Sequence, residues 1–130
     1  MARTNRSARQ AGARTERAVA DYLAGALNDD RIDRRVKTGA KDRGDIAGIR
    51  VHGGQRLVIE VKDCAKPTIP AWVAEAHTEA GNDDALTGVV VAKRRGTTDP
   101  GRYWVHMTLD DLLALLTGQR HGHRAEDVIA

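Results

Sequence analysis

The sequence predicts a single domain of the mixed α/β class. Two observations carry this prediction: helical segments alternate along the chain with short β-branched apolar runs, and 130 residues is the length of one domain with one core. The expected order is helix, three strands, helix, two strands and helix (αβββαββα). We expect a central mixed β-sheet between helical layers, with residues 1–118 forming the domain and residues 119–130 a polar C-terminal tail.

The first predicted helix runs from about residue 7 to residue 27. Glu16, Val19, Leu23 and Leu27 recur at helical spacing and therefore share one stripe. Residues 1–7 are polar and basic, and we expect them to form an arm that precedes the helix. The run Asn-Asp-Asp at positions 28–30 ends the helical pattern.

The central part of the chain predicts three strands followed by a helix. Residues 31–38 and 44–51 have extended patterns and are joined by a glycine-containing loop. Residues 55–62 contain LVIEV, an apolar run typical of a central strand that is buried on both faces. Two prolines then precede an alanine-rich helix over residues 71–80, which ends near Gly81.

The C-terminal part predicts two further strands and a last helix. The strand over 86–93 is apolar, and a basic loop separates it from a short strand over 103–107. Thr108 is a suitable N-cap for the final helix, because a threonine side chain can accept a hydrogen bond from the first turn. We expect the leucines of this helix to face the core as one stripe: Leu109, Leu112, Leu113 and Leu116.

Composition and charge exclude several classes of protein. The chain has no apolar run near the roughly 20 residues that span a bilayer and no apolar leader, so we expect no membrane partner and a cytoplasmic location, in a bacterial cell or a phage-infected host. The net charge is only +3. However, residues 1–43 carry 11 basic and 6 acidic side chains, whereas residues 75–84 hold four acids and no Lys or Arg. This asymmetry predicts a polyanionic partner for one face.

The hairpin formed by residues 44–62 carries the most informative charges. If its turn centres between residues 52 and 53, Asp45 lies opposite Glu60; if it centres one residue later, Asp45 lies opposite Lys62. Both registers place Asp45, Glu60 and Lys62 on one face, because residues two apart on a strand point the same way. Two carboxylates at this spacing repel each other unless a hard divalent cation lies between them.

This arrangement indicates phosphodiester hydrolysis. A magnesium ion held by Asp45 and Glu60 would polarise a phosphoryl oxygen and acidify a bound water. Lys62 would orient or deprotonate that water and neutralise the charge that develops on the phosphate. The alternative is structural, with Asp45 capping a strand and Glu60 paired with Lys62 on a half-exposed sheet. Charged residues in an apolar strand are costly unless they are paired or bind metal.

Glu16 is a further candidate for the same site. It lies on the apolar stripe of the first helix, so its carboxylate should point into the protein or its cleft. Gly12, one turn earlier, allows close approach of the backbone. Glu16 would then complete or support a metal site. In the alternative, it is a glutamate at the edge of the stripe that pairs with a nearby arginine.

These residues resemble the motif of the PD-(D/E)XK nuclease superfamily, most closely that of the archaeal-type Holliday junction resolvases. The matching residues are Gly44-Asp45, then Glu60-Val61-Lys62, with Glu16 on the preceding helix. The motif's leading proline is replaced by Gly44 here. The resemblance extends from about residue 9 to residue 107, and it implies the restriction-endonuclease-like α/β/α sandwich.

The resemblance also implies the cofactor and the assembly. Asp45, Glu60, the Val61 carbonyl and Glu16 would hold one or two Mg²⁺ ions, for which Mn²⁺ would substitute, and Lys62 would serve the water. Two symmetric nicks in a four-way DNA junction need two active sites, so the resemblance implies a homodimer. Two alternatives remain. One is a repair or restriction-type nuclease of the same superfamily that cuts duplex, flap or single-stranded DNA, and the other is a non-catalytic DNA-binding module.

Three basic clusters are candidates for contacts to DNA phosphates. They belong to the N-terminal segment and first helix, to the strand and loop before Asp45, and to the loop that follows residue 92. None has a pattern that reads bases, so we expect recognition of backbone and shape. The candidate residues are Arg9, Arg14, Arg17, Arg35, Lys37, Lys41, Arg43, Lys93, Arg94 and Arg95.

Overall fold

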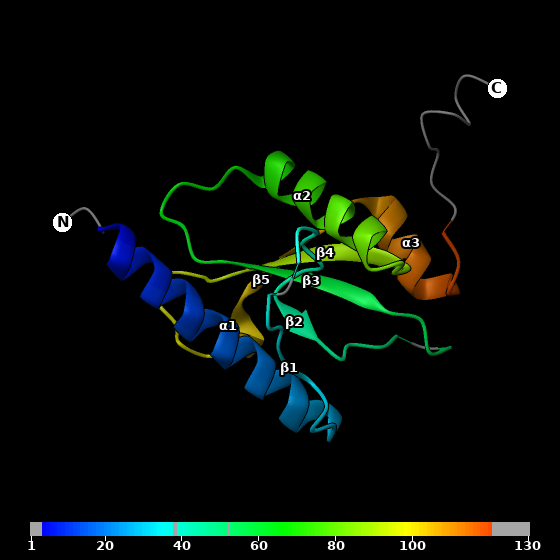
Figure 1. The fold of residues 1–130 in the computed structure, drawn as a ribbon, viewed down its shortest axis with the longest axis horizontal. Coiled ribbons are helices and arrows are strands. Elements are labelled where there is room, and N and C mark those ends of the chain that lie inside the picture. The colour runs from blue at the N-terminus through cyan, green and yellow to red at the C-terminus, as the bar shows by residue number, and fades with distance from the viewer. Residues whose placement is uncertain (1–3, 38, 52, 121–130) are drawn as a thin grey trace.

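The computed structural model describes residues 4–37, 39–51 and 53–120 and shows a mixed α/β fold (Figure 1). The predicted order of helices and strands is confirmed, with one short 3₁₀ helix added before the last strand. The elements are α1 (Asn5–Leu27), β1 (Asp33–Arg34), β2 (Ile46–Ala47), β3 (Leu57–Lys62), α2 (Ile69–Asn82), β4 (Thr87–Ala92), η1 (Pro100–Arg102), β5 (Trp104–His106) and α3 (Leu109–Thr117).

The strands form a mixed three-stranded sheet and a smaller two-stranded one. In the larger sheet β4 is central, pairs in parallel with β3 and pairs antiparallel with β5. Helix α2 makes the crossover that a parallel β3–β4 pair requires. Strands β1 and β2 pair antiparallel as the second sheet. The continuous apolar pattern of the two longest strands therefore corresponds to the two adjacent parallel strands.

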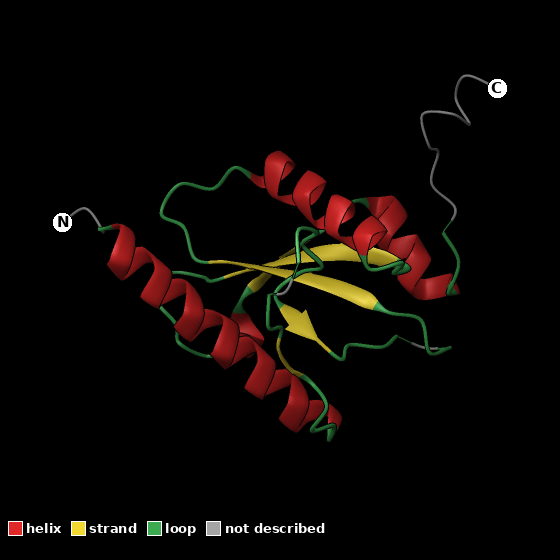
Figure 2. Cartoon of the chain, viewed as in Figure 1, coloured by secondary structure: helices red, strands yellow, loops and turns green. Residues whose placement is uncertain are grey.

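Helices cover both faces of the larger sheet (Figure 2). On one face, Val19 of α1 packs in a cluster with Ile59 and Val61 of β3. On the other face, Trp72 and Ala76 of α2 pack with alternate residues of β4. Because side chains alternate along a strand, β4 contributes to both clusters, with Val89 and Val91 on the α1 face and Val90 and Ala92 on the α2 face.

Helix α2 lies unusually close to β4 at Gly88. A Cβ atom added to Gly88 would lie 2.2 Å from the carbonyl oxygen of Ala76. Ala76 itself is fully buried, so both positions need small residues. This contact fixes the distance between the α2 backbone and the sheet.

The hairpin over 44–62 pairs, but not in either predicted register. Arg50 pairs with Arg56 near the turn, whereas the N–H of Asp45 donates to the Ile59 carbonyl (2.9 Å). The prediction that Asp45 lies opposite Glu60 or Lys62 is therefore wrong. Gly48, between these two contacts, has a φ of +87°, a conformation that breaks the regular pleat and allows the register to change. The strands predicted over 31–38 and 44–51 are correspondingly reduced to two residues each.

The last helix begins as predicted but buries a different face. Thr108 is its N-cap and forms a capping box with Asp111. The predicted leucine stripe is wrong as core: Leu109 is 80% exposed and Leu116 is 76% exposed, and Leu112 and Leu113 are also exposed. The buried side chains of α3 are Asp111 and Ala114, because Asp111 forms a polar contact with the rest of the domain.

Asp111 is fully buried and is held by four hydrogen-bond donors. It accepts from the Thr87 hydroxyl (2.7 Å), the Thr108 N–H (2.8 Å) and Arg120 (2.5 Å), and it contacts His77 Nε2 (2.8 Å). Burial alone would raise its pKa, but the hydrogen bonds from Arg120, Thr87 and His77 outweigh burial and lower the pKa below the usual range. This contact joins α3 to both α2 and β4.

The ends of the chain are only partly described. Residues 1–3 and 121–130 lie outside the described residues, so most of the predicted tail does too. Of the predicted N-terminal arm, residues 5–7 belong to α1, and Thr4 caps that helix by accepting from the Ser7 N–H. Among the described helices, none has the length and apolar character needed to cross a membrane.

Candidate active site

Glu60 and Lys62 extend from β3 toward α2. Ile59 and Val61 face α1, so the alternation of the strand turns Glu60 and Lys62 to the opposite face. Glu60 is buried, with 4% of its surface exposed. Lys62 forms an ion pair with Glu75 of α2 at 3.0 Å. The predicted charges on the apolar strand therefore meet acidic residues of the second helix.

Asp45 reaches the same end of β3 through its side chain. Its Oδ2 accepts a hydrogen bond from the Val61 N–H at 2.8 Å, and its Oδ1 lies 3.5 Å from Lys37 Nζ. Contacts to the Asp45 and Glu79 carboxyls help raise the pKa of Glu60 far above its usual range, although burial is the largest cause. The structure thus brings Asp45 and Glu60 together, as the sequence predicts, by a side-chain contact and not by strand pairing.

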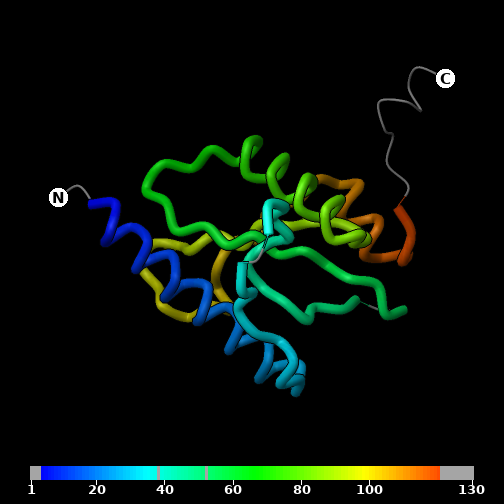
Figure 3. Tube along the Cα trace, in the orientation of Figure 1, coloured from blue at the N-terminus to red at the C-terminus, as the bar shows by residue number. Residues whose placement is uncertain are grey.

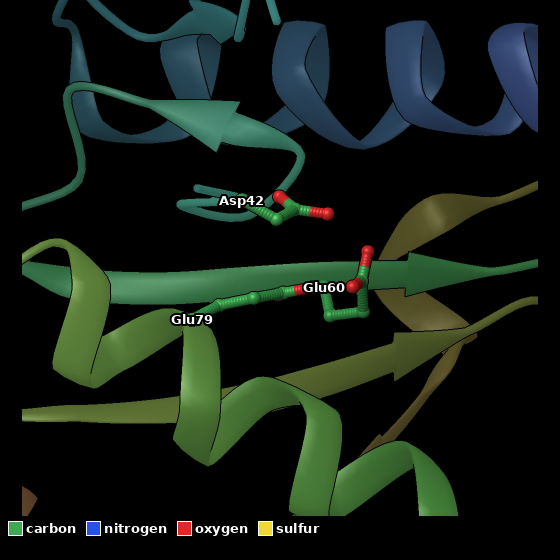
Figure 4. Close-up of side chains that lie close together, drawn as sticks. All are labelled: Asp42, Glu60 and Glu79. Atoms are coloured by element: carbon green, nitrogen blue, oxygen red, sulfur yellow. The ribbon is translucent and has the colours of Figure 1, made fainter. Parts of the chain in front are cut away.

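Two further acids belong to this cluster and were missed by the sequence analysis. Asp42, Glu60 and Glu79 each offer a carboxylate oxygen, and the three oxygens lie within 4.8 Å of one another. Figure 4 shows the Glu79 side chain extending from α2 toward Glu60, and the Asp42 side chain extending toward it from the loop before β2. The signal for Glu79 was present, since it shares the buried stripe of α2 with Trp72 and Ala76. No signal in the sequence identifies Asp42, because its position depends on how the loop folds.

The loop that carries Asp42 is tied to the end of α2. The Asn82 side chain donates to the Asp42 carbonyl at 2.7 Å, and Asp42 Oδ1 accepts from the Gly44 N–H at 2.9 Å. In the tube view, the cyan segment that contains this loop overlaps the C-terminal part of α2, and the Asn82 hydrogen bond joins the two (Figure 3). The loop therefore brings the Asp42 carboxylate toward Glu60, which Glu79 approaches from α2 (Figure 4).

Several oxygens of this cluster are buried without a hydrogen-bond partner. They are Oε2 of Glu60 and both Oε atoms of Glu79, whose side chain is 2% exposed. Burial raises the pKa of Glu79 to about 7. A buried carboxylate that accepts no hydrogen bond is unfavourable, so this group of acids is costly for the cation-free protein when it is ionised.

Lys62 and Lys37 supply the positive charges nearest to these acids. Burial lowers the pKa of Lys62, but its ion pair with Glu75 and the nearby Glu60 outweigh burial, so the pKa is raised overall. The pKa of Lys37 is likewise raised, because the charges of Asp45 and Asp42 outweigh its burial. Both ammonium groups are therefore charged at neutral pH. The pKa of Glu75 is lowered, first by its hydrogen bond with Glu60 and then by Lys62.

Glu16 adopts the arginine-paired arrangement. Its Oε1 accepts from Arg34 at 2.9 Å. Helix α1 covers the sheet face opposite to the one that carries Glu60, and Glu16 is not part of the group of acids whose oxygens lie within 4.8 Å. The negative charge of Glu16 does help to raise the pKa of Lys37. A metal-binding role for Glu16 stays a prediction.

Nine of the ten predicted DNA-binding residues line hollows on the described surface, and some of them line more than one. The largest, about 840 Å³, follows the ends of β3 and β4 and is lined by Lys93, Arg94 and Arg95 together with Lys66. Lys37, Lys41 and Arg43 line a smaller one of about 150 Å³ beside Asp42, and Arg35 lines it too. A third, of about 550 Å³, is lined by Arg9 and Arg17, among others. Arg14 is exposed on α1.

The basic residues differ in how far they are already engaged. Arg17 pairs with Asp33 at 2.6 Å and Arg35 contacts Asp83 at 3.5 Å. In contrast, Arg94 stacks over the ring of Trp104, 4.6 Å from its centroid, a contact that orients the guanidinium without neutralising it. The loop over 93–98 is therefore the basic segment best prepared to meet an anion.

Comparison with protein-family models, with curated proteins and with solved structures finds no significant match to the chain. The features that bear on function are therefore the acidic cluster and the basic surface around it.

Proposed function

We propose that this protein is a divalent-metal-dependent DNA endonuclease with the restriction-endonuclease-like α/β/α sandwich of the PD-(D/E)XK superfamily. One observation carries the proposal: Glu60 has a buried, unpartnered oxygen beside Asp45, at the strand end that also presents Lys62. A carboxylate in that position needs either a proton or a cation. The helices on both faces of the mixed sheet fit the sandwich.

The residues present fit a hard divalent cation such as Mg²⁺ or Mn²⁺. Glu60 supplies the free oxygen, and Asp45 lies next to it. The N–H of Val61 donates to Asp45, and the N–H and C=O of one strand residue point to the same edge, so the Val61 carbonyl also faces the Asp45 side. All three offer the oxygen ligands that these ions prefer. When bound, such a cation polarises a phosphodiester and acidifies a water.

Lys62 acts as a charged group in this proposal. Its raised pKa keeps it protonated at neutral pH, so it donates hydrogen bonds and neutralises charge on the phosphate, and it does not remove a proton from water. Its side chain is 19% exposed and is directed by Glu75. Lys37 contacts Oδ1 of Asp45, the carboxylate oxygen that does not accept from the Val61 N–H.

The basic hollows on either side of the acidic cluster support DNA as the substrate. The hollow lined by Lys93, Arg94 and Arg95 continues from Lys62, because the Lys93 N–H donates to the Lys62 carbonyl at 2.9 Å. The hollow lined by Lys41 and Arg43 adjoins Asp42. A polyanionic strand that crosses the end of β3 would meet positive charge on both sides of the reacting phosphate.

The exposed face of α3 supports a homodimer that acts on branched DNA. Leu109, Leu112, Leu113 and Leu116 form an uncovered apolar face on one short helix. The described residues offer one acidic cluster of this kind, whereas two symmetric nicks in a four-way junction need two active sites. We therefore assign a second copy of the chain to this face, and four-way junctions as the preferred substrate.

One cleavage experiment tests the enzymatic proposal. The purified protein is incubated with a labelled four-way junction, a flap, a linear duplex and a single strand, each with Mg²⁺ or EDTA. Glu60→Gln and Lys62→Ala should abolish cleavage, whereas Asp84→Asn, which removes an exposed charge just after α2, should not.

Paired symmetric nicks in the junction alone support a resolvase. Cleavage of the linear or flap substrates would instead indicate a repair or restriction-type nuclease. Binding to DNA without metal-dependent cleavage would refute the enzymatic proposal and leave a DNA-binding module.

A further inference from the structure

We propose that Asp42, Glu60 and Glu79 form the binding site for a hard divalent cation and that Glu79 of α2 is its principal ligand. This ligand set shares only Glu60 with the one that the nuclease resemblance implies, since Glu79 and Asp42 replace Asp45, the Val61 carbonyl and Glu16. It deepens the proposed function and rests on that function only for the use of the cation in cleavage, because the cation can be bound and measured without DNA.

The Glu79 side chain points into the acidic cluster. Its side chain is 2% exposed and extends from α2 toward Glu60, and both of its oxygens are buried without a hydrogen-bond partner (Figure 4). Trp72, Ala76 and Ala80 fill the remainder of the same stripe with apolar side chains. A glutamate at this place is therefore an expensive choice for packing, and a bound cation accounts for it.

The three carboxylate oxygens of this site lie close together. They come from three segments, namely the 39–44 loop, β3 and α2, and lie within 4.8 Å of one another. Carboxylates that bind Mg²⁺ at about 2.1 Å each have their oxygens within about 4.2 Å of one another. A small inward movement of the carboxylates would bring the three oxygens within this range.

More acidic than basic side chains surround Glu60. Five carboxyl groups of the described chain lie close together there: Asp42, Asp45, Glu60, Glu75 and Glu79. Among the described residues, only Lys37 and Lys62 oppose them directly, and these pair with Asp42, Asp45 and Glu75. The two acids left without a basic partner among the described residues are Glu60 and Glu79. A divalent cation between them would take the place of the proton that Glu60 holds and would neutralise both carboxylates.

The site would have an open side. Asp42 is exposed, whereas Glu60 and Glu79 are buried, so a cation held by all three would keep its remaining positions on the Asp42 side. Mg²⁺ usually retains several waters and takes substrate phosphate oxygens as further ligands. The hollow lined by Lys41 and Arg43 adjoins this open side and would deliver a phosphate to it.

The test measures Mn²⁺ binding by the DNA-free protein, with electron paramagnetic resonance to count free Mn²⁺ and calorimetry as a second readout. Wild-type protein should bind Mn²⁺, and Mg²⁺ should compete. Glu79→Gln should weaken binding at least about tenfold, because it removes one of three charged ligands. Asp84→Asn removes an exposed charge near the same helix and should bind as wild type does.

Asp42→Asn is the second variant, because Asp42 is exposed and its loss cannot disturb the core. It should also weaken Mn²⁺ binding. Wild-type affinity in both Glu79→Gln and Asp42→Asn would overturn the proposal, as would a wild-type protein that binds no Mn²⁺.

The two proposals fail separately. Mn²⁺ binding that depends on Glu79, without cleavage of any DNA substrate, would leave the cation site standing and refute the nuclease. Cleavage by a Glu79→Gln variant with unchanged Mn²⁺ affinity would refute the cation site and leave the nuclease proposal standing.

Discussion

Replacing Glu79 by glutamine should stabilise the cation-free protein at alkaline pH. The pKa of Glu79 rises from 4.5 to about 7 because the group is buried. Each pKa unit corresponds to about 1.4 kcal/mol, so the ionised carboxylate destabilises the folded state by about 3 kcal/mol at pH 8. The buried amide of the glutamine also needs hydrogen-bond partners, so the substitution recovers only part of this lost stability. We expect the free energy of unfolding to rise by about 2 kcal/mol.

The sign of the pH dependence follows from the raised pKa. The folded protein holds the Glu79 proton more tightly than the unfolded chain does, so its stability falls as pH rises from about 4.5 to about 7 and then levels off. Below about pH 4.5 the group is protonated in both states and contributes nothing. Glu79→Gln should therefore remove this loss, and its advantage should be absent at pH 4.

The assay is thermal unfolding followed by circular dichroism in EDTA, at pH 4 and pH 8. A gain of about 2 kcal/mol corresponds to a rise in Tm of about 6–10 °C for a domain of this size. Adding Mg²⁺ should stabilise the wild type at pH 8 and leave Glu79→Gln nearly unchanged. The reasoning is refuted if Glu79→Gln lowers the Tm equally at both pH values, because Glu79 would then hold the fold together through contacts of its own.

Three further predictions concern other parts of the molecule. Asp111→Ala should lower the free energy of unfolding by about 3 kcal/mol, measured by urea denaturation, because it leaves Thr87, His77 and Arg120 without their buried acceptor. Since the pKa of Asp111 is lowered, its contribution is complete above about pH 4 and should disappear as pH falls further; a pH-independent difference would contradict this account. Leu112→Glu should convert the proposed dimer to a folded monomer in analytical ultracentrifugation, and an unchanged mass would remove α3 from the interface. The combined change of Lys93, Arg94 and Arg95 to alanine should weaken DNA binding and reduce the slope of log affinity against log salt by about 2–3, and an unaltered slope would exclude this loop from phosphate contacts.

The periodic parts of the sequence predicted the fold well. The apolar runs of β3 and β4 depend on burial against neighbours, so their spacing carries the information. The stripe predicted for α1 is confirmed only in part, because Val19 is buried but Leu27 is 57% exposed. The N-cap at Thr108 was predicted because a cap is a local interaction. The short strands β1 and β2 were predicted too long, since glycines interrupt their pairing and pattern alone does not show where it stops.

The errors at α3 and in the site have a common physical origin. The leucines of α3 fit a core stripe, but a single buried polar contact at Asp111 decides which face of that helix packs inward. Asp45 and Glu60 were correctly expected to meet, although the side chain of Asp45 makes the contact after the register shifts. Glu79 and Asp42 join them only through the docking of α2 and of a loop, which are tertiary events. Burial of an acid on an apolar stripe identified Glu16 as a candidate and would equally have identified Glu79.

The close contact between Gly88 and Ala76 has a consequence for ion selectivity. Because no side chain fits between β4 and α2 there, the helix cannot move closer to or away from the sheet without a change at one of these two residues. Glu79 lies less than one turn beyond Ala76, so the same contact sets how far its carboxylate stands from Glu60 on the adjacent strand. A larger residue at position 88 would widen the cage, and we expect it to favour Ca²⁺, with its longer metal–oxygen bonds, over Mg²⁺. Backbone packing, and not only the choice of ligands, would then determine which ion the protein prefers.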